Sequence, residues 1–149
     1  MDESANAMLE RAIGLAAFLH AGQVDKIGEP YILHPLRVML AVKEAGGSIE
    51  QQAAAALHDV IEDCDVGVEF LAQRFPEAVC KLVDALTRPE DEDYEAYVRR
   101  AISVPGASLI KRADVRDNYG RVDLLPDEAT KQQLRQKYES ALSLLRDAE

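Results

Sequence analysis

The chain has 149 residues and a mass of 16.4 kDa, which suits one domain with a single sizeable core. Hydrophobic residues make up 48% and charged residues 30%, a composition that excludes an intrinsically disordered chain. Because 17 Lys and Arg stand against 27 Asp and Glu, the net charge is -10 and binding to a nucleic-acid polymer is disfavoured. We therefore expect one domain over residues 1–149, with an aliphatic core because tryptophan is absent.

The sequence predicts neither export nor membrane insertion. Charges interrupt the apolar stretches well before membrane-spanning length. Asp2, Glu3 and Glu10 occupy the region where a signal peptide is basic and then apolar. Cys64 and Cys80 fit neither a CxxC motif nor a disulfide framework, so we expect free thiols packed as small hydrophobes. These features predict a cytoplasmic protein without a membrane partner and leave the oligomeric state open.

Apolar residues recur at helical spacing from the start of the chain. They predict a first helix from about Ser4 to Gly22, with His20 on or near its buried stripe. A loop follows. Pro35 suits the first turn of a second, short helix that ends at the glycine pair beginning with Gly46.

The third predicted helix runs from Ile49 to about Glu62. Ser48 and Gln51 form a capping box at its start, and the four alanines at 53–56 allow close packing on all sides. Further helices are predicted at about 66–74, 76–87, 93–103 and 108–117, and from 127 to near the end. Since no sustained period-two alternation occurs, we predict an all-α domain of six to eight helices.

One histidine, His58, stands in an acidic segment that also contains Asp59, Glu62 and Asp63. On a continuous helix His58 would lie above Glu62, and Asp59 above Asp63, so four polar groups would share one side. Burying an imidazole and carboxylates without partners is unfavourable, and a bound divalent cation would supply the missing partner. Imidazole and carboxylate ligands suit Mn²⁺, Fe²⁺ or Zn²⁺.

A cation with open coordination positions lowers the pKa of bound water from about 15.7 to roughly 7–9 and polarises a phosphoryl oxygen. Glu62 or Asp63 would then accept the proton. The alternative from the residues alone is structural. In that case His58 is a hydrogen-bonded helix histidine, the acidic residues up to Asp65 cap the next helix, and His34 is an ordinary residue near a helix start.

Five short segments together resemble the HD-domain hydrolases of the RelA/SpoT group. They are Gly22-Gln23, the PYILHP segment from Pro30 to Pro35, the LHDVIED segment from Leu57 to Asp63, the VDALT segment from Val83 to Thr87, and the KRADVRDN segment from Lys111 to Asn118. They keep the order and approximate spacing of that group over about residues 9–118. The nearest resemblance is to the stand-alone small alarmone hydrolases, which implies manganese-dependent removal of the 3′-pyrophosphate of (p)ppGpp.

The resemblance assigns roles by position. It implies metal ligands at His34, His58, Asp59 and Asp114, a catalytic acidic pair at Glu62 and Asp63, and a polar pocket residue at Asn118. Only the resemblance connects His34 and Asp114 with the cluster around His58.

Basic side chains are expected to neutralise the phosphate groups of the substrate. With Asn118, the expected substrate-binding residues are Lys26, Lys111, Arg112 and Arg116, and Arg121 belongs to the same basic cluster. The alternative is a solvated helix face whose basic residues pair with Asp114 and Asp117. Tyr138 lies on the apolar face of the last predicted helix, where core packing is expected.

The sequence also departs from the family pattern. Val24, Asp25 and Lys26 follow Gly22-Gln23 where the alarmone hydrolases usually carry basic residues, one of them an Arg that packs on guanine. Asp117 stands where His is usual, and Cys64 where Thr is common. Two other functions therefore stay open beside (p)ppGpp hydrolysis. One is a phosphatase for another nucleotide, such as NADPH, a deoxynucleotide or an adenine alarmone. The other is a non-catalytic nucleotide-binding module.

Overall fold

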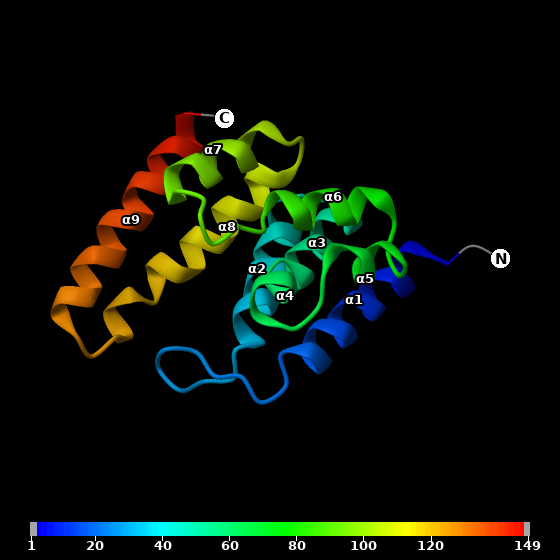
Figure 1. The fold of residues 1–149 in the computed structure, drawn as a ribbon, viewed down its shortest axis with the longest axis horizontal. Coiled ribbons are helices and arrows are strands. Elements are labelled where there is room, and N and C mark those ends of the chain that lie inside the picture. The colour runs from blue at the N-terminus through cyan, green and yellow to red at the C-terminus, as the bar shows by residue number, and fades with distance from the viewer. Residues whose placement is uncertain (1–2, 148–149) are drawn as a thin grey trace.

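The computed structural model describes residues 3–147, and within them the chain is helical (Figure 1). The elements are α1 (Ala5–Leu19), α2 (Leu33–Glu44), α3 (Ile49–Leu57), α4 (Val60–Asp63), α5 (Val68–Ala72), α6 (Glu77–Ala85), α7 (Tyr94–Ser103), α8 (Ala107–Gly120), the 3-10 helix η1 (Val122–Leu124) and α9 (Glu128–Asp147). Seven of the helices have nine or more residues, and the prediction of an all-α fold is confirmed. Over residues 3–147 extended backbone pairs only in an isolated bridge between Val24 and Pro30.

Capping residues set several helix ends as the sequence predicts. The Ser4 hydroxyl accepts a hydrogen bond from the Ala7 N–H at the start of α1, and Ser48 and Gln51 form the capping box of α3. α1 ends before Gly22, which adopts a positive φ of 84° in the turn that follows. No helix within residues 3–147 has the length and apolar character needed to cross a membrane.

The predicted helix over residues 49–62 is wrong in one respect, because the chain breaks it into α3 and α4. His58 and Asp59 form the connection between them. The His58 ring donates from Nδ1 to the carbonyl oxygen of Ala55 at 2.6 Å, and so satisfies a carbonyl at the end of α3. The stacking of His58 above Glu62 on one helix is therefore replaced by a turn.

α3 lies at the centre of the larger core. The side chains of Ala53–Ala56 and Leu57 are fully buried, and α3 packs against α1, α2, α6 and α8. Because alanine has no side chain beyond Cβ, these helices can approach α3 closely. The alanine run thus places His58, directly after α3, in the interior of the molecule.

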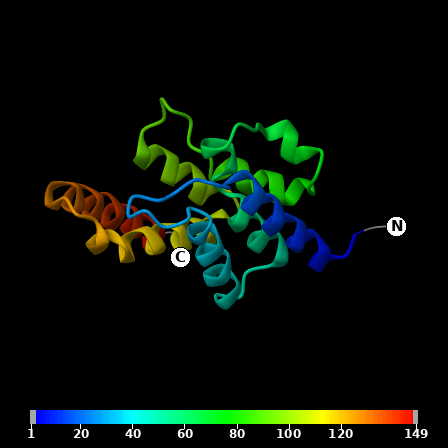
Figure 2. The same cartoon turned by 90° about the horizontal axis from the view of Figure 1, so that it is seen from below.

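A second, smaller cluster joins α7, α8 and α9. Its buried members are Tyr97, Val98, Val115, Ala141 and Leu145. Figure 2 shows α8 and α9 side by side at one end of the molecule and α1 at the other. α8 packs against both α2 and α9, so it connects the two clusters.

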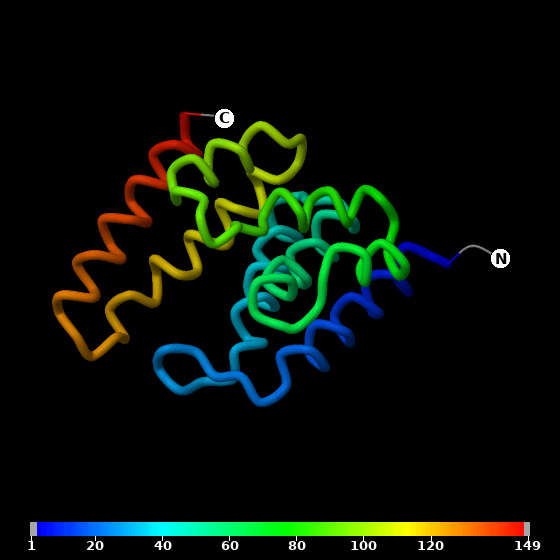
Figure 3. Tube along the Cα trace, in the orientation of Figure 1, coloured from blue at the N-terminus to red at the C-terminus, as the bar shows by residue number. Residues whose placement is uncertain are grey.

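The loop between α1 and α2 runs toward the end of α8 (Figure 3). An ion pair of 2.7 Å between Arg121 Nη2 and Glu29 Oε1 fastens this loop to the residue that follows α8. The side chains predicted to carry function come from α2, from the α3–α4 connection and from α8, where these elements meet.

Candidate functional site

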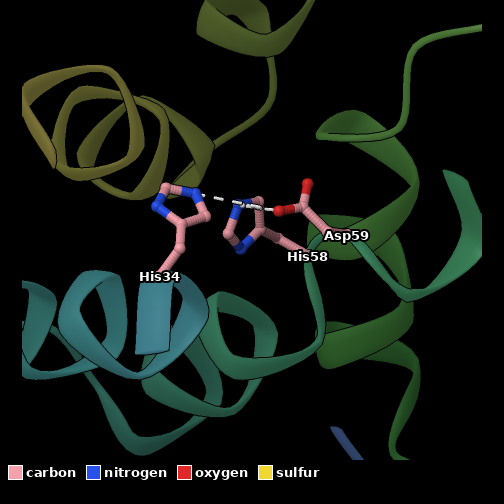
Figure 4. A group of neighbouring side chains, drawn as sticks. All are labelled: His34, His58 and Asp59. Carbon is pink, nitrogen blue, oxygen red and sulfur yellow. Dashed lines mark ion pairs between the residues drawn. The ribbon is translucent and has the colours of Figure 1, made fainter. Parts of the chain in front are cut away.

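His34, His58, Asp59 and Asp114 converge on one point, although His34 and Asp114 are 80 residues apart in the sequence. His34 Nε2 lies 2.9 Å from Asp114 Oδ1 and 3.7 Å from Asp59 Oδ2. His58 Nε2 lies 3.1 Å from Asp59 Oδ2 and 3.3 Å from Asp114 Oδ1. In Figure 4 the two rings and the Asp59 carboxylate point toward one another. The structure therefore brings together all four residues that the family resemblance selects.

Hydrogen bonds on the far side of each ring fix how the two imidazoles face this point. His34 Nδ1 is 2.7 Å from Asp117 Oδ2, and Arg37 holds the same carboxylate through contacts of 2.7 and 3.0 Å. His58 uses Nδ1 for the Ala55 carbonyl. Both rings are thus oriented with Nε2 toward the cluster, an arrangement typical of metal-ligating histidines.

The contacts of His58 Nε2 indicate that these residues fit a bound cation. This atom is buried and has no hydrogen-bond partner, yet two carboxylate oxygens lie within 3.3 Å of it. When Nδ1 donates to a carbonyl, a neutral imidazole carries its lone pair on Nε2, and that lone pair repels the oxygens. A positive charge between the nitrogen and the oxygens removes this repulsion. Burial disfavours a proton on His58, but Asp59 and Asp114 raise the pKa of the ring, so a proton occupies this place until a metal cation replaces it. The donor set of imidazole nitrogens and carboxylate oxygens fits a divalent metal ion.

The pKa values show two ionised carboxylates facing two imidazoles that hold their protons tightly. Burial favours the neutral form of Asp59, but the positive charge of the neighbouring His58 outweighs burial and lowers the pKa of Asp59 to about 2. Burial likewise opposes ionisation of Asp114, but Lys111 and His58 hold its pKa well below the usual range. Burial disfavours the charged form of His34, yet hydrogen bonds to Asp114 and Asp117 raise its pKa to about 9. Metal binding would compete with these protons.

The two carboxylates are themselves held in place. The Tyr31 hydroxyl donates to Asp59 Oδ2 at 2.6 Å. Lys111 Nζ lies 2.9 Å from Asp114 Oδ2 and donates to the Tyr97 hydroxyl at 3.1 Å. Lys111 is only 4% exposed, so this predicted substrate-binding residue neutralises Asp114 from within the protein.

A cavity of about 690 Å³, the first cavity, opens from the cluster and contains both predicted catalytic carboxylates. Burial raises the pKa of Glu62 and of Asp63. Glu62 also accepts a hydrogen bond from the backbone N–H of Arg88, which fixes its carboxylate. Asn118 lines the cavity too and is 3.4 Å from Asp114 Oδ1 through its Nδ2 donor. Ionised carboxylates in this position can accept a proton from water.

A second cavity of about 420 Å³ lies beside the first. The two share Tyr31, His34, Asn118 and Tyr138 as lining residues. Lys26, which the sequence analysis names as a substrate-binding residue, lines the second cavity, and Val122, Leu125 and Leu134 form an apolar wall of the same cavity. Tyr138 packs against the smaller core cluster, as expected, and in addition lines both cavities.

The structure places Arg112 and Arg116 elsewhere. Both line a third cavity of about 320 Å³ between α2 and α8. They lie roughly 100–140° around the axis of α8 from Lys111, and therefore on a different face from Asp114 and Asn118. Arg112 Nη2 donates to the carbonyl of Leu145 in α9, at 3.3 Å. The expectation that these two arginines face the substrate is thus corrected.

The sequence interpretation missed several residues of the site. Tyr31 belongs to the PYILHP segment, which is a local signal for it. Asp117 falls in the KRADVRDN segment as a departure from the family pattern, but it holds His34. Arg88 and Lys137 also line the first cavity, and neither belongs to a segment that the sequence analysis singles out. Lys137 reaches the cavity because α9 packs against α7 and α8.

Comparison with known proteins agrees with this geometry. The family model of the HD domain matches residues 12–114, a range that contains all four clustered residues. A protein of Aquifex aeolicus (strain VF5) called guanosine-3′,5′-bis(diphosphate) 3′-pyrophosphohydrolase is 35% identical over 131 residues, which is 83% of this chain and 19% of that protein. A probable GTP pyrophosphokinase of Mycobacterium leprae (strain TN) is 32% identical over 89% of this chain and 18% of that protein.

The chain thus spans about a fifth of the length of these curated relatives. A solved structure is similar over the whole fold, with a TM-score of 0.84, 26% sequence identity and coverage of 100% of this chain and 90% of the other. It is described as a metazoan ortholog of SpoT that hydrolyses ppGpp. Since the family model covers well over half of the sequence and includes the His–Asp cluster, the chain belongs to the HD-domain family.

Proposed function

We propose that this chain is a divalent-cation-dependent phosphohydrolase that removes the 3′-pyrophosphate of guanosine 3′,5′-bis(diphosphate), with Mn²⁺ as its cation. The observation that carries the proposal is the unpartnered, buried His58 Nε2 among three other potential ligands, at the head of a cavity that also contains two carboxylates. The names of the Aquifex relative and of the similar solved structure support guanosine 3′,5′-bis(diphosphate) as the substrate.

His34, His58, Asp59 and Asp114 would hold the cation. When bound, such a cation polarises a phosphoryl oxygen and lowers the pKa of a water molecule. The Tyr31 hydroxyl donates to Asp59 Oδ2, the oxygen that faces the two imidazoles. Lys111 holds the outer oxygen of Asp114, and Asp117 holds the His34 ring. These contacts keep the ligands in place before substrate binds.

Glu62 and Asp63 are assigned to proton transfer. The oxygen of a water molecule forms a bond to the phosphorus nearest the ribose, and the bond from this phosphorus to the 3′-oxygen breaks. One proton of the water passes to Glu62 or Asp63, and the 3′-oxygen receives a proton. The products are GDP and pyrophosphate. Because burial raises the pKa of both carboxylates, each is a stronger base than an exposed carboxylate would be.

The second cavity is the site assigned to the nucleoside. Its apolar wall offers contact area for a base, and Lys26 adds positive charge near the phosphates. Asn118 and Tyr138 stand where the two cavities meet, and so at the position of the sugar. A nucleoside there would place its 3′-phosphate beside the His–Asp cluster.

A phosphatase for another nucleotide is the second candidate function, and the loop before α2 favours it. Asp25 Oδ1 accepts hydrogen bonds from the N–H groups of Ile27 at 3.0 Å and Glu29 at 2.9 Å. This carboxylate therefore stabilises the loop, and the position offers no guanidinium to stack on guanine. An adenine alarmone, a deoxynucleotide or NADPH is a candidate substrate on this ground.

Incubation of the purified chain with Mn²⁺ and guanosine 3′,5′-bis(diphosphate) tests the proposal. We expect release of equal amounts of GDP and pyrophosphate, with loss of activity in Asp114→Asn and wild-type activity in Asp123→Asn as a matched control. A panel of the other nucleotides runs in parallel. Turnover of a different nucleotide alone would reject the substrate, and tight nucleotide binding without turnover under any divalent cation would show a non-catalytic module.

A further inference from the structure

Three cationic residues line the first cavity: Arg88, Lys111 and Lys137. Lys111 is paired with Asp114. Lys137 forms no ion pair with any residue in the range 3–147, and neither does the side chain of Arg88 over the same range. Two of these three cations are therefore available to an anion.

Aromatic rings hold Lys137 in position. Its Nζ lies 4.3 Å from the centroid of the Tyr94 ring and 5.8 Å from that of Tyr138. The Arg88 guanidinium lies 5.7 Å from the same Tyr94 ring. Cation–π contacts of this kind fix the direction of an ammonium group but leave its charge uncompensated.

Among the charged groups that act most strongly on Lys137, three are cations and one, Asp114, is an anion, while the carboxylates of Asp59, Glu62, Asp63 and Glu90 line other parts of the first cavity. The Lys137 side chain is half-buried, and burial lowers its pKa, as do the positive charges of Arg88, Lys111 and Lys26. The whole chain has a net charge of -10, so three cations acting together on one ammonium are an exception to its charge as a whole. A bound phosphoryl group would relieve this repulsion by forming charge-assisted hydrogen bonds.

The positions of the two cavities indicate which phosphoryl group of the substrate lies near Lys137. Tyr94, Arg88 and Lys137 line the first cavity but not the second, whereas Tyr138 lines both. If the nucleoside occupies the second cavity and its 3′-phosphorus lies at the shared border, the terminal phosphoryl group of a 3′-diphosphate extends into the first. It then approaches Lys137.

We propose that Lys137, assisted by Arg88, binds the terminal phosphoryl group of a 3′-diphosphate and makes the site select diphosphates over monophosphates at that position. This inference rests on the proposed function and adds a specificity determinant to it. Lys137 binds the part of the substrate that leaves as pyrophosphate and takes no part in proton transfer.

The test compares two substrates that differ only in this group, guanosine 3′,5′-bis(diphosphate) and guanosine 5′-diphosphate 3′-monophosphate. Lys137→Met keeps the length of the side chain and removes its charge. We expect kcat/KM for the diphosphate to fall roughly 10- to 100-fold, chiefly through KM, and that for the monophosphate to fall less than threefold. Lys137→Arg should restore most of the selectivity.

Lys131→Met is the matched control, because Lys131 lies on the same helix, pairs with Glu128 at 3.6 Å and does not line the first or second cavity. It should behave as wild type. Lys137→Gln provides a second neutral variant, and circular dichroism checks that each variant is folded. An equal loss on both substrates, or no loss on either, would overturn the inference.

Calorimetric titration of pyrophosphate into the chain in EDTA separates this inference from the proposed function. We expect pyrophosphate to bind more tightly than orthophosphate, and Lys137→Met to weaken pyrophosphate binding at least tenfold. If the wild-type chain hydrolyses neither guanosine nucleotide, the proposed function fails, and this titration still decides whether Lys137 is a pyrophosphate receptor. Unchanged pyrophosphate affinity in Lys137→Met would contradict the inference.

Discussion

Glu62 occupies a position that favours proton transfer at the expense of folding stability. Its carboxylate is partly buried in the first cavity, and burial raises its pKa above 4.5. The ionised form is therefore less favourable in the folded chain than in the unfolded chain. The hydrogen bond from the Arg88 N–H stabilises the ionised carboxylate, but it offsets the effect of burial only in part, since the pKa of Glu62 is still raised.

Glu62→Gln should lower kcat roughly 10²- to 10⁴-fold, because an amide cannot accept the proton of water. The same variant should melt at a higher temperature than wild type at pH 8 in EDTA, because the amide removes a buried charge and keeps an acceptor for the Arg88 N–H. Steady-state kinetics and thermal denaturation measure the two effects. A fully active Glu62→Gln would exclude the assigned role.

The pH dependence of this stabilisation follows from the direction of the shift. A folded-state pKa above the unfolded value means that the folded chain binds the proton more tightly, so the contribution of Glu62 to stability falls as pH rises through that window. The difference in melting temperature between Glu62→Gln and wild type should therefore shrink as pH falls toward 4.5. A difference that grows on acidification would show that Glu62 is stabilised as a carboxylate.

Asp117 acts on the site through His34. Asp117→Ala removes the acceptor at His34 Nδ1 and the partner of Arg37, so the ring loses its fixed orientation. We expect Mn²⁺ affinity to fall about 10- to 100-fold. Calorimetric titration with Mn²⁺ provides the measurement, and Asp123→Ala, which loses a surface pair with Arg135, is the control. Equal Mn²⁺ affinity in wild type and Asp117→Ala would contradict this role.

At the scale of the elements, the fold depends on close packing around α3. Every side chain of its alanine run is fully buried against neighbouring helices. Larger side chains there would push α1 or α2 outward and shift the connection that carries His58 and Asp59. The alanine run therefore affects stability and the geometry of the candidate metal site together.

Ala54→Leu should destabilise the fold by about 1–3 kcal/mol, because the interior around α3 has no space for three more carbon atoms. For a domain of this size each kcal/mol lowers the melting temperature by roughly 2–4 °C. Ala17→Leu, on the exposed side of α1, should change stability by less than about 0.5 kcal/mol. Thermal denaturation of both variants tests the argument, and equal melting temperatures would refute it.

At the scale of the whole molecule, the candidate metal site joins segments that are distant in sequence. α2, the α3–α4 connection and α8 each contribute ligands, so a bound cation would cross-link the larger core to the helix that reaches the smaller cluster. A ligand that binds only the folded chain stabilises it in proportion to the logarithm of its concentration. We propose that residues 1–149 unfold as one domain, with both clusters melting together.

Mn²⁺ at about 100 times its Kd should stabilise the chain by about 2.7 kcal/mol. The melting temperature should then rise by roughly 5–10 °C in a single transition, and EDTA should reverse the rise. His58→Ala should show no such rise. Scanning calorimetry with and without Mn²⁺ gives the measurement. Two separate transitions would contradict the single-domain proposal, and an equal rise in His58→Ala would place the cation elsewhere.

The sequence by itself determined the all-α class, most helix positions and the four residues of the His–Asp cluster. Helical periodicity and capping are local, and the four cluster residues lie in short segments whose family resemblance can be recognised without knowledge of the fold. The sequence did not predict the break after α3, because the break depends on a hydrogen bond from the His58 ring to the Ala55 carbonyl. A pattern of residue types does not specify such a side-chain contact.

Only the tertiary structure decided which basic residues face the site. Lys111, Arg112 and Arg116 look equivalent in sequence, but the rotation of α8 buries Lys111 beside Asp114 and turns the two arginines to another cavity. Lys137 reaches the first cavity from α9, with no motif to mark it. A basic side chain can bind a phosphate only if it points into the cavity. Helix packing decides where it points, through contacts between residues far apart in the chain.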